Sequence, residues 1–409
     1  MNESNDPQFD ETYQRLKANT SWYNKSYSAY PIGIHEQGLA IATEGTINPY
    51  ALKYGMCFQN HSIKNHFDWF WDVNDMKEKR AMILAKVKSN PAFTDKVLQE
   101  AKANHKKFYQ YNLEIADFKL ASLSDEKLKG VFEKLHNLLI EVSVWSYAVD
   151  AFLSDGEEDW LVMLIKGELK EKATSEVIEN LTLPAYDSFV NEAEILFLKI
   201  VSELQSKNNE KAAQLAQEYQ KEYFWIRSNY KEYKRVTADQ ILSEASEWLE
   251  KNKDKDLKEL ISNDAGRIAQ NISKKTETYK HLTISADLQA ILKFSEIFTY
   301  LQDKRKERVL RMNTLFYEFV AETQKRFSIP DPLGFYMTDR ELFGLYDGKK
   351  PDVAQLQERY DKGFLTIFYN HTFKIISAEE YKREGIEANC FKTQVISRKS
   401  RAPPPSKAR

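Results

Sequence analysis

The chain has 409 residues, a hydrophobic fraction of 42%, a charged fraction of 29% and a formal net charge of −2. This length supports a sizeable core and two or three domains, and the near-neutral charge excludes a general attraction to nucleic acid or anionic membranes. The longest apolar runs are too short to span a bilayer. With two cysteines and a polar, acidic start, we expect a cytoplasmic protein without a secretory signal or a disulfide scaffold.

The first part of the chain is predicted to contain a short polar helix and a small β-containing region, which together form an N-terminal domain at residues 1–71. Within it, apolar residues alternate in strand fashion around Gly33 and Gly38. Residues 72–330 follow as a large helical body, because their apolar residues recur at helical spacing. The segments with this spacing are 75–88, 93–116, 124–153, 185–207, 209–230, 237–252 and 256–281.

A different module is expected after two closely spaced prolines, at residues 331–390. Thr338 and Glu341 form a capping box that opens a short helix, and a second helix ends at a glycine. Residues 364–369 and 372–376 are then predicted to form the two strands of a hairpin. Its turn, at Asn370 and His371, lacks the usual glycine. The fold is therefore predicted to be mainly α, with a C-terminal helix–hairpin–helix module and a basic disordered tail at residues 391–409.

One helix between residues 285 and 327 carries arginines on an otherwise apolar face. Arg305 and Arg308 fall on this face at helical spacing. An unpaired buried charge is expensive, so both guanidinium groups need anionic partners. A ligand phosphate or carboxylate would match their fork geometry. We favour an internal ion pair but keep both residues as candidate ligand-binding residues; the acids considered as partners are Glu296, Glu307 and Glu318.

A second candidate site is an aromatic pocket for an amphipathic small molecule. Large rings beside a few charges suit such a ligand, although rings at helical spacing more often form a core. We favour the interpretation that these rings form a core. If a pocket exists, the candidate ligand-binding residues are Trp69, Trp71, Tyr223, Trp225 and Arg227.

Motifs for phosphate loops, activated nucleophiles and paired metal ligands are missing from the sequence. We therefore predict no catalytic residue, no metal site and no cofactor. Whether the chain is a component of an enzyme stays open.

The order of features between residues 285 and 385 resembles the central helical region of phosphoenolpyruvate-utilising proteins, such as phosphoenolpyruvate synthase and rifampin phosphotransferase. The similar features are the arginine-bearing helix at 301–308, the Thr-x-x-Glu helix at 337–348 and an arginine, Arg359, before a hairpin. Segment 222–227 is similar to another part of that region. The resemblance implies a role in docking the acceptor substrate and guiding a swivelling domain.

The chain departs from complete members of that family. It contains no Gly-Gly pair, none of its histidines follows a serine, and it stops at Arg409, about where a swivelling domain would be expected to begin. No catalytic residue of the family can be carried over, and we expect no ATP hydrolysis by the chain alone.

Our leading hypothesis is a non-catalytic substrate- or partner-docking protein that acts with separate ATP-grasp and phosphohistidine-domain proteins. The alternative is a stand-alone helical protein that binds an amphipathic small molecule in an aromatic pocket. Neither hypothesis includes a nucleic acid or membrane partner.

Overall fold

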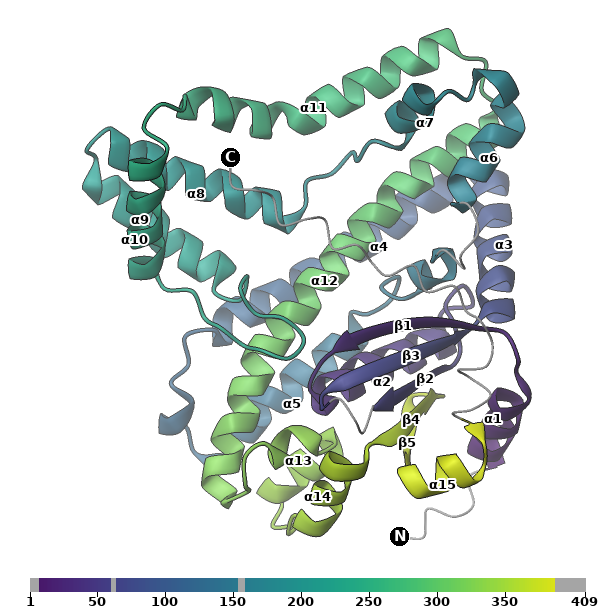
Figure 1. The fold of residues 1–409 in the computed structure, drawn as a ribbon, viewed down its shortest axis with the longest axis vertical. Helices are drawn as coiled ribbons and strands as arrows, with labels where there is room; N and C mark the ends of the chain where they lie inside the picture. Colours follow the sequence, from purple (N-terminus) through teal and green to yellow (C-terminus); the bar gives the residue numbers. More distant parts are fainter. Residues whose placement is uncertain (1–6, 60–63, 154–158, 387–409) are drawn as a thin grey trace. The chain divides into compact units, whose positions relative to one another are not determined.

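The computed structural model describes residues 7–59, 64–153 and 159–386. In these ranges the protein is mainly α, with helices α1 to α15 and strands β1 to β5 (Figure 1). The predicted fold class is therefore confirmed. The predicted disordered tail at residues 391–409 lies outside the described residues.

The chain divides into two compact units, each with its own packing. Unit 1 combines the N-terminal residues up to Ala85 with residues 143–160 and the residues from Thr323 onward. Unit 2 consists of residues 86–142 and 161–322.

Unit 1 is built around one antiparallel sheet in the order β1-β3-β2-β4-β5. The pairing of β2 with β4, in which Cys57 lies opposite Thr366, joins the first part of the chain to the last. The β-containing N-terminal region and the C-terminal hairpin therefore share a sheet. The strands are β1 (Trp22–Ser28), β2 (Gly55–Gln59), β3 (His66–Asp72), β4 (Phe364–Tyr369) and β5 (Thr372–Ser377).

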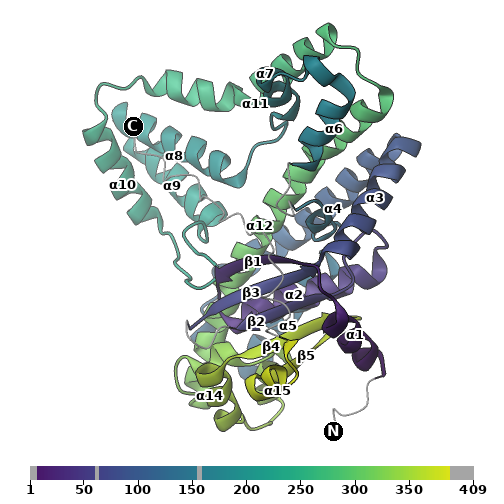
Figure 2. The same ribbon diagram turned by 45° about the vertical axis from the view of Figure 1, so that its right-hand side comes forward.

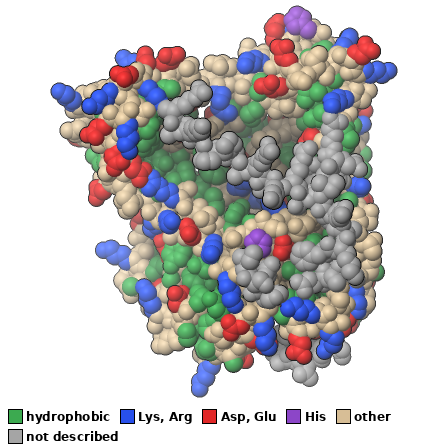
Figure 3. Space-filling view, in the orientation of Figure 1, with side chains coloured by type: hydrophobic (Ala, Val, Ile, Leu, Met, Phe, Trp, Pro, Cys, Tyr) green, Lys and Arg blue, Asp and Glu red, His purple; other side chains and the backbone are tan. Residues whose placement is uncertain are grey.

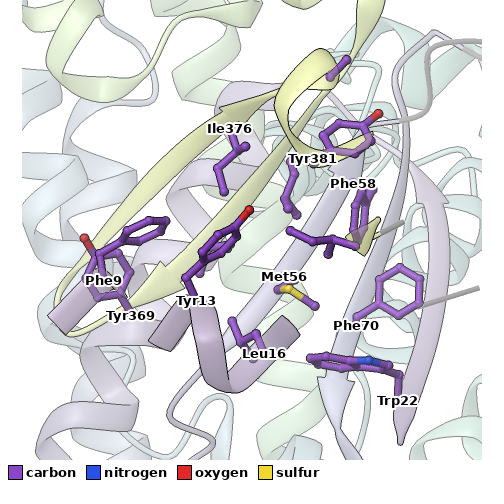
Figure 4. Packing of buried hydrophobic residues seen from close by; sticks show 14 residues of the cluster. Phe9, Tyr13, Leu16, Trp22, Met56, Phe58, Phe70, Tyr369, Ile376 and Tyr381 are labelled. Carbon is purple, nitrogen blue, oxygen red and sulfur yellow. The ribbon is translucent and has the colours of Figure 1, made fainter. Parts of the chain in front are cut away.

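One face of this sheet is covered by α1 (Pro7–Ala18) and α15 (Ala378–Arg383), as Figure 4 shows for the buried side chains. Successive strand residues point to opposite faces, so every second residue joins this core. The labelled members of the cluster are Phe9, Tyr13, Leu16, Trp22, Met56, Phe58, Phe70, Tyr369, Ile376 and Tyr381.

The opposite face packs against α2 (Pro31–Ile47). The prediction of strands over this segment is wrong. This helix is buried on nearly all sides, polar residues such as Glu36 and Glu44 included, so it lacks the one-sided apolar stripe by which a surface helix is recognised. Pro31 favours the start of the helix, because its ring holds φ near the helical value. Gly38 has no side chain and so lets the backbone of α2 pack closely on the Phe368 ring of β4.

The C-terminal module agrees with its predicted local structure. Both hydrogen bonds of the capping box between Thr338 and Glu341 are present, and Arg359 holds the Glu341 carboxylate with two hydrogen bonds of 2.7 and 2.9 Å. The hairpin turn at Asn370 and His371 uses positive φ values of 36° and 58° in place of a glycine. The helices of this module are α13 (Asp339–Tyr346), α14 (Val353–Lys362) and, after the hairpin, α15.

Unit 2 contains helices and connecting loops but no strand among its described residues (Figure 2). Helices α8, α9 and α10 pack on one another around a shared apolar cluster. The short helices α6 and α7 were not predicted. The helices are α4 (Ala92–Ile115), α5 (Asp125–Glu141), α6 (Trp160–Leu169), α7 (Ser175–Thr182), α8 (Phe189–Gln205), α9 (Asn209–Tyr223), α10 (Ala238–Lys251) and α11 (Leu257–His281).

Two long helices carry residues of both units. Helix α3 (Val73–Ser89) belongs mainly to unit 1, and α12 (Ala286–Phe327), of 42 residues, belongs mainly to unit 2. Among the described residues, no helix combines the length and the apolar character needed to cross a bilayer.

Substitution of Gly38 by alanine is expected to destabilise the protein, because the new Cβ would lie 2.0 Å from a ring carbon of Phe368. We expect a loss of about 1–3 kcal/mol from overpacking, measured by urea denaturation. The matched control is Gly130→Ala in α5, where a Cβ meets nothing within 4 Å and should stabilise the helix by ~0.5–1 kcal/mol. Equal effects of the two substitutions would contradict the close packing of α2 on β4.

The buried carboxyl of Glu44 should make stability depend on pH. Its side chain accepts hydrogen bonds from the backbone nitrogens of Tyr147 and Ala148 at 2.7 and 3.3 Å, and burial raises its pKa to about 7. Between pH 4.5 and 7 the unfolded chain loses this proton while the folded chain keeps it. The free energy of unfolding should therefore fall as pH rises through this window, by up to ~3 kcal/mol.

The test compares wild-type protein with Glu44→Gln by denaturation at several pH values. The difference in unfolding free energy between the two proteins should change across pH 4.5–7 and stay constant above it. A difference that does not vary with pH would show that Glu44 does not titrate in this window.

Candidate functional site

The seven residues singled out from the sequence fall in both units. Two of them lie on β3 in unit 1, and five lie in unit 2. The predicted aromatic pocket therefore combines residues of different units. The unit 1 residues are Trp69 and Trp71, and the unit 2 residues are Tyr223, Trp225, Arg227, Arg305 and Arg308.

Trp69 and Trp71 lie in the packed core of unit 1. Their rings stack with centroids 5.3 Å apart, and Trp69 also stacks on Phe368 at 5.3 Å. Both side chains are at most 4% exposed. This packing agrees with the core role that we favoured for large aromatic residues.

Arg227 forms a surface ion pair with Glu244, and the two side chains are 41% and 39% exposed. The hydrogen bond to this carboxylate raises the pKa of Arg227. An exposed pair of this kind contributes little to stability.

Arg305 is half-buried and Arg308 is buried on α12. The three acids considered as their internal partners are engaged by other cations. Glu296 pairs with Lys275, Glu318 with Arg235, and Glu307 with Arg311 and Lys304. A role of Arg305 and Arg308 in ligand binding stays a prediction.

A cavity of about 320 Å³ in unit 2 gathers charged and aromatic side chains from four helices. Helix α4 supplies three residues, α8 one, α9 two and α12 three. Of the predicted residues, Tyr223 lines this cavity. The lining residues are His105, Lys106, Tyr109, Glu192, Glu222, Tyr223, Lys304, Glu307 and Arg311.

The buried carboxylate of Glu307 is the centre of the charge network at this cavity. Its Oε1 accepts a hydrogen bond of 3.0 Å from Nε of Arg311, and its Oε2 accepts one of 2.9 Å from Nζ of Lys304. Burial alone would raise the pKa of Glu307, but the cations Lys304 and Arg311 outweigh it and help to hold the pKa below its usual value. Glu307 is therefore ionised at neutral pH.

Arg311 lies between two aromatic rings. Its guanidinium carbon is 4.6 Å from the ring centre of Tyr109 and 4.9 Å from that of Trp225. Arg311 is only 1% exposed. Cation–π attraction to the two rings and the ion pair with Glu307 offset the cost of burying its charge. Among the described residues, no acceptor reaches its Nη1 atom. Arg311 therefore lines the cavity with a guanidinium whose buried Nη1 has unused donor capacity.

Tyr109 connects Arg311 to a second acid. The Tyr109 hydroxyl donates a short hydrogen bond to the carboxylate of Glu222, and Nε1 of Trp225 donates to the Glu222 carbonyl at 3.0 Å. Burial raises the pKa of the Glu222 carboxyl. Within the described parts of the chain, no lysine or arginine lies within ion-pair distance of this carboxylate.

His105 adds a neutral ring to the cavity. Its Nε2 lies 3.6 Å from Oε2 of Glu307, and its Nδ1 is buried without a hydrogen-bond partner in the described structure. Burial lowers the pKa of His105 to about 4, despite the neighbouring carboxylate. The imidazole is therefore uncharged at pH 7 and can donate or accept a hydrogen bond.

Several residues of this site were missed in the sequence. The spacing of Lys304, Glu307 and Arg311 could have shown a network, because steps of three and four bring opposite charges together on one helix face. No local pattern marked His105, Tyr109 or Glu222, which belong to other helices.

Protein-family models, curated proteins and solved structures gave no match to this chain. Among the described residues, no group of three or more His, Cys, Asp or Glu side chains is arranged to hold a metal ion. On the face drawn in Figure 3, acidic and basic side chains are interspersed and are not segregated by sign, in line with the small net charge.

The Glu307→Gln variant should lose much of its stability, because it leaves Arg311 and Lys304 without their buried counter-charge. We expect a loss of about 3–5 kcal/mol in the free energy of unfolding. The matched control is Glu244→Gln, which breaks the exposed pair with Arg227 and should cost less than about 1 kcal/mol. Denaturant titration of both variants measures the difference; similar small losses would mean that Glu307 is not needed as a counter-ion.

Proposed function

We propose that the protein is a docking protein for a small molecule and that unit 2 holds the ligand in the cavity between α4, α8, α9 and α12. The observation that carries this proposal is Arg311, which lines the cavity and keeps Nη1 without an acceptor. A buried donor left unsatisfied costs about 1–3 kcal/mol. A ligand acceptor would remove this cost.

The character of the cavity supports the same proposal. Ligand sites usually have volumes of roughly 300–1,000 Å³ and combine rings with a few converging polar groups. The rings of Tyr109 and Tyr223 lie beside Arg311 and Glu222 in a cavity of about 320 Å³. An amphipathic molecule would find both apolar and polar contacts there.

Following the resemblance to phosphoenolpyruvate-utilising proteins, we further propose that the bound molecule is an acceptor substrate. Separate nucleotide-binding and phosphohistidine components would then act on it. In support, the arginine-bearing helix that carries the resemblance also supplies Lys304, Glu307 and Arg311 to the cavity. The chain itself would position the acceptor and would not activate phosphate.

A ligand of this cavity should raise the melting temperature of the protein, since it binds the folded state only. We expect a thermal-shift screen of small aromatic acids, amines and amino acids to yield such ligands. Their affinity should fall about tenfold or more in Arg311→Met, which removes the charged donor but keeps an apolar side chain between the rings.

The control is Arg227→Ala, whose side chain is exposed in the pair with Glu244 and should leave the affinity unchanged. Arg311→Met changes the core, so Tyr109→Phe is tested beside it. This variant keeps the ring under Arg311 but removes the hydroxyl that holds Glu222. Ligand affinities that are the same in wild-type protein and in both cavity variants would rule out this site.

A further inference from the structure

Two side chains of opposite charge at the cavity of unit 2, Arg311 and Glu222, can each take one more partner. Arg311 can donate to an anion, and Glu222 can pair with a cation. Nη1 of Arg311 has no acceptor among the described residues. The Glu222 carboxylate has a hydroxyl donor, Tyr109, and is attracted electrostatically by Arg311. No lysine or arginine of the described residues lies within ion-pair distance of it. One group can accept an anion and the other a cation.

Most of the remaining charges at the cavity are already paired; the exception is Lys106, which is exposed and has no ion pair among the described residues. Glu307 is held by Arg311 and Lys304, and Lys304 also lies 3.6 Å from Glu192. The cavity is lined by three acidic residues and three lysines or arginines. A simple anion would therefore leave Glu222 without a cation, and a simple cation would leave Arg311 without an acceptor.

Tyr109 fixes the spatial relation of these two groups. Its ring lies under the Arg311 guanidinium, and its hydroxyl holds the Glu222 carboxylate. Arg311 and Glu222 thus both contact the same residue, and each lies within range of the other's charge. A ligand with both charges close together can reach both.

We infer that the ligand is a zwitterion of the amino-acid class, with its carboxylate on Arg311 and its ammonium group on Glu222. A guanidinium matches a carboxylate in fork geometry, and the ammonium group adds an ion pair to Glu222. The rings of Tyr109 and Tyr223 leave room for an apolar or aromatic side chain. This inference rests on the proposed docking function and names the class of molecule that is docked.

The experiment measures the affinity of the full chain for each of the twenty standard L-amino acids by titration calorimetry. The tightest binder is then compared with its decarboxylated amine and its deaminated acid. We expect both analogues to bind about ten- to hundredfold more weakly, because each leaves one charged group of the cavity unpaired.

Two variants assign the charges. Glu222→Gln should abolish the preference for the amino acid over the deaminated acid, and Arg311→Met should abolish the preference over the amine. Glu222 is only half-buried, so Glu222→Gln is expected to fold and keeps the inference testable if Arg311→Met does not.

The outcomes separate the inference from the proposed function. If the amine or the acid binds as tightly as the amino acid, and Arg311→Met still weakens binding, the docking function stands and the zwitterion is overturned. If no amino acid binds but other ligands depend on Arg311, the zwitterion is also overturned. If no ligand depends on Arg311 or Tyr109, both proposals fail.

Discussion

The structure of unit 2 depends on one buried charge, the carboxylate of Glu307. Arg311 can leave water only because this carboxylate lies beside it, and the stacking of Arg311 between Tyr109 and Trp225 follows from that pairing. A buried ion pair adds little net stability compared with apolar packing. The pair itself forms within α12, because Glu307 and Arg311 lie four residues apart on that helix. The contact with α4 comes from the ring of Tyr109, which packs on the paired guanidinium.

Two buried glutamates show how the surroundings decide the charge of the same side chain. Glu44 in unit 1 has backbone and amide donors but no cation within ion-pair distance among the described residues, and burial raises its pKa to about 7. Glu307 in unit 2 is also buried, but its ion pairs with Lys304 and Arg311 help to lower its pKa. Hydrogen bonds alone do not offset the loss of water around a carboxylate, whereas nearby cations do. The charged site therefore occurs where arginine and lysine share a helix face with the acid.

The proposed docking role follows from the balance between paired and unpaired charges at the cavity. A fully paired network would be purely structural, and a site with a single sign of charge would select a simple ion. Here the inner pairs are complete, while Arg311 and Glu222 each retain one unmet requirement. The rings between them provide apolar surface without adding charge. Such a site suits a small molecule that carries both polar and apolar parts.

The sequence by itself determined the helical class, the capping box of Thr338 and Glu341, the hairpin at Asn370 and most helix positions in unit 2. These features depend on neighbours within a few residues, where periodicity and capping chemistry act directly. Only the tertiary structure decided that α2 is a buried helix, that β2 pairs with β4, and that His105, Tyr109 and Glu222 meet Arg311. Those relations join residues far apart in the chain. They result from burial and charge pairing in three dimensions, for which a single sequence has no local signal.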